Sequence, residues 1–230
     1  MLRLVAFFFG AFLLMLALRH VPVVGRIFEI PLIGFWGAAI LLSLLLSRVA
    51  SVGVDRASLR RKVADLERVD TPHNQGKLGS LLLAGGRAKA AVTPLERAVA
   101  GEPDSIEWRY RLGLARLEAG DAAGAADALA AVSARDEEYA YGAAQLALAR
   151  ALERTGRRSD ALDALDRFER NHGPSPESAC RRGILLKRLG RPDEARAVLA
   201  SVAGLASRAG GRQKRGAAGW TWRAFLARFF

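Results

Sequence analysis

The 230-residue sequence predicts an all-α protein, in which an N-terminal transmembrane helical hairpin precedes an α-solenoid of four helix pairs. Two observations predict this class. A set of small residues recurs four times at a nearly fixed spacing, and two uncharged apolar runs precede the recurring segment. The recurrence is typical of stacked helix–turn–helix units, because each unit covers the apolar face of its neighbour. The apolar runs are typical of membrane spans.

Four glycines mark the predicted turns, and their spacings are 34, 36 and 34 residues: Gly86, Gly120, Gly156 and Gly190. A small residue precedes each glycine by seven positions: Gly79, Gly113, Ala149 and Gly183. An alanine follows by five positions and a leucine by nine: Ala91, Ala125, Ala161 and Ala195, and Leu95, Leu129, Leu165 and Leu199. Small residues let two antiparallel helices approach closely, and glycine permits the positive φ of a tight turn.

The pattern resembles the tetratricopeptide repeat family, in its membrane-anchored bacterial form. The residues that carry the resemblance best are Leu112-Gly113, Gly120-Asp121, Ala125 and Leu129. It covers residues 72–209, divided as 72–105, 106–141, 142–175 and 176–209. The third unit departs from the pattern at Ala149, where the family prefers glycine. The resemblance implies a surface that binds a protein, without catalysis.

Residues 1–50 are predicted to form the membrane hairpin. Residues 4–18 and 30–47 contain no charged side chain, and Pro22 and Gly25 lie between them. A cleaved signal peptide is the alternative for the first run, but no small-residue cleavage site precedes Arg19. Positive charges before the first run and after the second place both ends in the cytoplasm. The predicted location is therefore the inner membrane, crossed twice, with the repeats in the cytoplasm.

Residues 51–71 are predicted to form an amphipathic linker helix with Leu59, Val63 and Leu66 on one face. This face could shield the apolar edge of the first repeat, or it could mediate self-association. The segment Asp70-Thr71-Pro72 is predicted to start the first repeat helix, with a cap and a proline in the first turn.

Residues 210–230 are predicted to form a flexible basic linker followed by an aromatic amphipathic tail. Aromatic side chains beside arginines suit a membrane interface. The predicted interface residues are Trp220, Trp222, Arg223, Phe225, Leu226, Phe229 and Phe230. A capping helix over the last repeat and a partner-docking helix are the alternatives.

The family resemblance also implies a partner-binding groove lined by the first helix of each pair. The residues that fall there are Tyr110, Leu114, Leu117, Arg150, Arg154, Ile184, Lys187 and Arg188. An apolar middle with a basic C-terminal half predicts a protein or peptide partner with acidic side chains. The alternative is that these charged residues are ordinary solvated side chains.

Composition and motifs exclude several functions. The net charge is +12, but residues 72–209 contribute only +3, so the repeats are not predicted to bind nucleic acid. The basic flanks predict contact with membrane lipids. Cys180 is the sole cysteine, and His20, His73 and His172 form no metal-spaced pair, so neither metal, cofactor nor enzymatic activity is predicted.

The sequence therefore predicts a membrane-anchored scaffold or adaptor that recruits a protein partner. The alternative is a non-catalytic subunit or assembly factor of an inner-membrane complex, with the hairpin as its main interface through residues such as Gly34 and Gly37.

Overall fold

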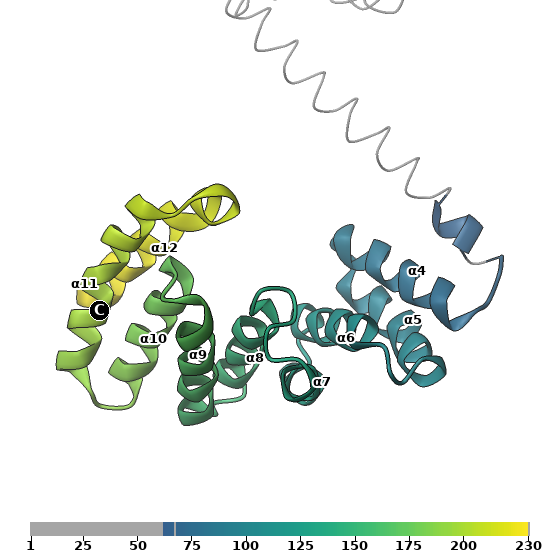
Figure 1. The fold of residues 1–230 in the computed structure, drawn as a ribbon, viewed down its shortest axis with the longest axis horizontal. Helices are drawn as coiled ribbons and strands as arrows, with labels where there is room; N and C mark the ends of the chain where they lie inside the picture. Colours follow the sequence, from purple (N-terminus) through teal and green to yellow (C-terminus); the bar gives the residue numbers. More distant parts are fainter. Residues whose placement is uncertain (1–61, 67, 230) are drawn as a thin grey trace, which may run out of the picture. The chain divides into compact units, whose positions relative to one another are not determined.

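The computed structural model describes residues 62–66 and 68–229, with the backbone alone for residues 211–215. This part of the chain is all-α and contains no strand. After a short helical segment at residues 62–66, the helices are α4 (Pro72–Ala84), α5 (Ala88–Gly101), α6 (Ile106–Ala119), α7 (Ala122–Arg135), α8 (Ala143–Arg154), α9 (Arg158–His172), α10 (Pro176–Arg188), α11 (Pro192–Arg208) and α12 (Gly211–Phe229) (Figure 1). The predicted helical repeat is confirmed for these residues.

Helices α4 to α11 pack as successive pairs, α4 with α5, α6 with α7, α8 with α9 and α10 with α11 (Figure 1). The turn glycine of every pair has positive φ, as predicted: 73° at Gly86, 100° at Gly120, 79° at Gly156 and 76° at Gly190. These angles lie in the left-handed region, where a side chain would be strained. The chain can therefore reverse within a few residues and return the second helix along the first.

The two helices of a pair approach most closely at the small residue of the first helix. A Cβ atom added to Gly113 would lie 2.6 Å from Leu129 Cγ, and one added to Gly183 would lie 2.5 Å from Leu199 Cγ. Ala125 and Leu129, which face this contact from α7, are both fully buried. The recurring small residues are therefore packing positions, as the spacing predicts.

The first helices begin at hydroxyl caps. The Thr71 Oγ1 atom accepts a hydrogen bond from the Asn74 amide at 3.2 Å, and Pro72 occupies the first turn of α4. Ser175 and Ser178 form a reciprocal capping box at the start of α10. Helix α8 instead follows Gly142, at the end of the longer loop that accounts for the one spacing of 36 residues.

The buried core of the described residues lies along the pairs in three clusters. Buried alanines and leucines of α6 to α11 form the first, and those of α4 to α6 form the second. The third joins α10, α11 and α12 through Cys180, Val202 and Ala224. Val63 and Leu66, two of the three apolar residues of the predicted linker helix, pack against the cluster of the first pair. This contact matches the shielding role.

Helix α12 corrects the prediction of a flexible linker and a tethered tail. It runs without a break from Gly211 to Phe229 and packs against α10 and α11 (Figure 1). Ala217 and Ala224 are buried, and the Lys187 ammonium group donates a hydrogen bond to the Ala227 carbonyl oxygen at 3.0 Å. Burial of this alanine face outweighs the low helix propensity of the glycines. Helix α12 therefore covers part of the last pair, as the capping alternative requires, while its contacts with lipid or a partner stay predictions.

The predicted location in the inner membrane is also corrected. Across residues 62–66 and 68–229, no helix combines the length and the apolar run that a membrane crossing requires. Along the sequence of the described helices, charged residues interrupt the runs of apolar residues. The predicted hairpin in residues 1–50, the start of the linker helix in residues 51–61 and the alternative interface at Gly34 and Gly37 lie outside the described residues.

Candidate functional site

The residues predicted to bind a partner lie on α6, α8 and α10, the first helices of the second, third and fourth pairs. We call this surface the first-helix face and define it as Tyr110, Leu114, Arg150, Arg154, Ile184, Lys187 and Arg188. Tyr110, Leu114 and Ile184 are half-buried, because each packs against the core and leaves part of its side chain free. Apolar side chains in this state can still contact a partner.

Leu117 does not belong to this face, although the sequence predicts that it does. The sequence predicts it in the groove, but its side chain is 0% exposed. It belongs to the core cluster that joins α6 and α7 to α8 and α9. A side chain that fills the space between two pairs cannot also contact a partner.

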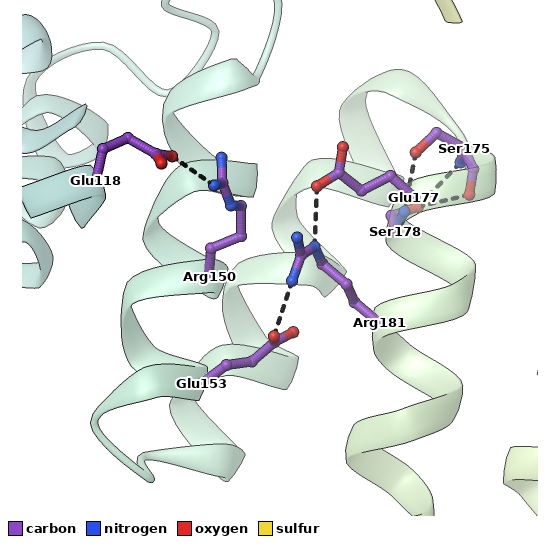
Figure 2. Close-up of polar contacts among 7 residues, drawn as sticks. All are labelled: Glu118, Arg150, Glu153, Ser175, Glu177, Ser178 and Arg181. Carbon is purple, nitrogen blue, oxygen red and sulfur yellow. Dashed lines mark hydrogen bonds and ion pairs between the residues drawn. The ribbon is translucent and has the colours of Figure 1, made fainter. Parts of the chain in front are cut away.

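Arg150 on α8 is not a free cation. Its guanidinium group lies 2.8 Å from a carboxylate oxygen of Glu118 on α6, and the two side chains are 29% and 48% exposed (Figure 2). The ion pair links the first helices of two neighbouring pairs. An acidic partner would have to compete with Glu118 for Arg150, which lowers the gain from any such contact.

A second bridge links α8 to α10. Arg181 lies between two carboxylates, at 2.8 Å from Glu153 on α8 and 2.9 Å from Glu177 on its own helix (Figure 2). Arg181 and Glu153 are only 14% and 18% exposed. Burial raises the pKa of Glu153, and the nearby Arg181 acts in the opposite direction. This buried pair fixes the spacing of the two helices, because breaking it would leave a charge without a partner.

The remaining predicted cations differ in how they are held. Arg154 donates a hydrogen bond to the carbonyl oxygen of Leu117 at the end of α6, and Lys187 donates to α12. Arg188 is exposed and forms no ion pair with any residue that the structure describes. Among the described residues, Arg188 is therefore the predicted groove cation that neither a carboxylate nor a carbonyl oxygen holds.

Tyr110 has a distinct environment. Its ring packs edge-on against Tyr139 from the α7–α8 loop, with ring centroids 5.3 Å apart. Burial raises the pKa of Tyr110, and the charges of Arg111 and Arg150 oppose that shift. The phenol is therefore neutral at physiological pH and offers an aromatic surface with one polar atom.

The sequence did not indicate Glu118 or Arg181 as functional residues. Their partners Arg150 and Glu153 are roughly one repeat away in the sequence, so the only signal was opposite charge at related positions of successive first helices. Many exposed residues of the repeats satisfy that condition, and only the packing of α6, α8 and α10 selects these two.

The predicted interface residues on α12 fall into two groups. Trp220 is half-buried beneath the guanidinium groups of Arg181 and Arg223, at 5.0 and 4.9 Å from its ring centroid. The others are exposed and form the aromatic stripe, which we define as Trp222, Phe225, Leu226 and Phe229. Phe230 lies outside the described residues. Contact of this stripe with membrane lipids stays a prediction.

No group of three metal-ligating side chains is found among the described residues. Burial raises the pKa of the Cys180 thiol to about 11, so the sole cysteine is not a nucleophile at neutral pH. His73 packs edge-on against Trp108, and His172 packs against Phe168, so both rings have structural contacts.

Pairs of helices that stack through small residues define an α-solenoid of helix–turn–helix units. Two family models, both described as tetratricopeptide repeat, match residues 85–164 and 146–211. Together they span more than half of the chain. Residues 85–211 are therefore tetratricopeptide repeats, as the sequence resemblance implies.

Solved structures have the same fold. MamA from Desulfovibrio magneticus RS-1 is 19% identical, with 70% of this chain and 93% of that chain covered and a TM-score of 0.59. A thermophilic tetratricopeptide repeat protein of Thermus thermophilus is 24% identical, with 69% and 84% covered and a TM-score of 0.53. At these identities the likeness establishes the fold alone. No curated protein matched the chain.

Proposed function

We propose that this protein is a non-catalytic scaffold that binds a segment of a protein partner on its first-helix face. The observation that carries the proposal is the arrangement of half-buried Tyr110 and Leu114 on α6 and half-buried Ile184 on α10, the two first helices that ion pairs link to α8. Apolar anchors beside fixed polar groups are the usual means by which helical repeats hold a peptide. The family likeness supports the same class of function.

The ion pairs suit this role because they preorganise the face. Glu118–Arg150 and Glu153–Arg181 hold neighbouring first helices in register before any partner arrives. A rigid face loses less conformational entropy on binding, so more of the contact energy appears as affinity. The partner's apolar residues supply most of that energy. Its acidic residues would act mainly at Arg188, which lacks an ion pair among the described residues.

The proposal is tested by site-specific photocross-linking in cells. A benzoylphenylalanine is placed at Leu114 or at Ile184 in the full chain, and cross-linked proteins are identified by mass spectrometry. The matched control places the same group at Ala200, an exposed residue of the second helix α11. We expect the two face positions to capture one common protein that the control does not. Capture of the same proteins from all three positions, or of none, refutes a dedicated site on this face.

A further inference from the structure

The outer side of α12 is the most apolar exposed surface in the described residues. Trp222 is 62% exposed, Phe225 49%, Leu226 37% and Phe229 67%. The Trp222 and Phe225 rings stack with centroids 5.8 Å apart, and Phe225 and Phe229 follow at 5.0 Å. The aromatic stripe is therefore one continuous patch along the last two turns of the helix. Contiguous exposed patches of this kind mark contact sites.

The position of α12 in the array makes this patch unusual. Arg181 contacts Trp220 and Lys187 contacts Ala227, so α12 runs parallel to α10 and takes the place of a fifth first helix. Each earlier first helix is covered by a second helix of its own pair. No described helix covers α12 in that way. The outer side of α12 instead presents four large apolar side chains.

The charged residues around the aromatic stripe indicate which kind of molecule could bind to it. Residues 210–230 contain five basic residues and no acidic residue. Arg223 and Arg228 are exposed beside the stripe. A second copy of this surface would bring like charges together, which disfavours self-association. An occupant with acidic side chains along its edges would be attracted.

We propose that the aromatic stripe of α12 binds an amphipathic helix of a partner protein, with acidic residues along both edges of that helix's apolar face. The bound helix would cover α12 as α11 covers α10, with its apolar residues packed on Trp222, Phe225 and Phe229. Its carboxylates would meet Arg223 and Arg228. This site is separate from the first-helix face and does not depend on the function proposed for that face.

The probe is a synthetic 18-residue helical peptide with leucines along one face and glutamates along both edges. Its affinity for the full chain is measured by fluorescence anisotropy. A second peptide carries lysine in place of every glutamate. We expect the acidic peptide to bind at least tenfold more tightly than the basic one, and more weakly as salt is added.

Variants locate the binding. The double substitution Phe225→Ser and Phe229→Ser is expected to weaken the acidic peptide at least tenfold, because exposed aromatics are typical binding hot spots. The matched control is Tyr141→Ser, which removes an aromatic that is 91% exposed elsewhere. It is expected to leave binding unchanged. Circular dichroism and urea midpoints should be the same for all three proteins, since the substituted side chains are exposed.

Three outcomes overturn the proposal. In the first, the two peptides bind equally, or neither binds. In the second, sedimentation shows a dimer of the wild-type chain that the Phe225→Ser, Phe229→Ser variant loses, which would make a second copy the occupant. In the third, vesicles of phosphatidylglycerol and phosphatidylcholine bind through the stripe and the acidic peptide does not. Retention of peptide binding by a Leu114→Asp variant separates this result from that for the first-helix face.

Discussion

Substitution of Gly113 by alanine tests the claim that the pairs pack through their small residues. The added Cβ would lie 2.6 Å from Leu129 Cγ and 2.9 Å from its Cδ2 atom. Carbon atoms in contact are normally about 3.5–4.0 Å apart, so α6 and α7 must separate or Leu129 must move by about 1 Å. Overpacking of this kind costs roughly 1–3 kcal/mol. Alanine in place of a helical glycine recovers about 1 kcal/mol of helix propensity.

The matched control is Gly204→Ala in α11. The nearest atom to a Cβ at Gly204 is Arg208 Nη2 at 3.9 Å, so the methyl group enters open space. This variant should gain up to about 1 kcal/mol of stability from propensity alone. The propensity terms of the two variants cancel in their difference, which leaves the packing cost of roughly 1–3 kcal/mol.

The measurement is urea denaturation of the two variants and the wild type, followed by circular dichroism at 222 nm. We expect Gly113→Ala to unfold at lower urea than Gly204→Ala, with the wild type between them or close to Gly113→Ala. Equal stabilisation by the two substitutions would refute the reasoning, because it would mean that α6 and α7 have room for a methyl group at Gly113.

Three further predictions concern buried polar groups. The Gln75 amide donates a hydrogen bond to Asp70 at 2.6 Å, whereas the Gln145 amide has no partner among the described residues. In urea denaturation, Gln75→Leu should therefore lower the free energy of unfolding by about 1.5–3 kcal/mol, and Gln145→Leu should leave it unchanged. A loss at both positions would contradict this. Burial raises the pKa of Glu153 in the folded state above its ordinary value of 4.5. Between these two pKa values the folded protein binds a proton at Glu153 that the unfolded chain does not, so the free energy of unfolding falls as the pH rises through this range. Glu153→Gln should remove this pH dependence from urea midpoints measured from pH 4 to pH 7. The prediction is wrong if the wild type becomes more stable relative to the variant as the pH rises across that range. Because burial raises the pKa of Cys180 to about 11, iodoacetamide at pH 8 should modify it only in urea, and rapid labelling of the native protein would show that the thiol is accessible.

The repeated core was predictable from the sequence because its cause is local and recurs. A glycine that needs positive φ, such as Gly120, and a small residue at a helix contact, such as Gly113, leave the same signature in each unit. The first-helix face was predicted less accurately. The repeat pattern gives the helix on which a residue lies. It does not show whether the next pair buries the side chain, as it buries Leu117.

The C-terminal helix shows the limit most clearly. The glycines and basic residues of 210–216 predicted a flexible linker before an amphipathic tail, because sequence patterns report local propensity. The structure extends the helix of the tail back to Gly211, and this helix is buried against α10 and α11 at Ala217 and Ala224.

The repeat, its turns and the pairing of helices follow from the sequence alone, since they depend on residues within one unit. Which charges are neutralised follows only from the packing of the pairs. Arg150 and Arg181 meet the carboxylates of Glu118 and Glu153 across neighbouring first helices. The physical reason is that an ion pair requires a separation of a few ångströms between side chains distant in sequence, and only the packing of the pairs brings these atoms together.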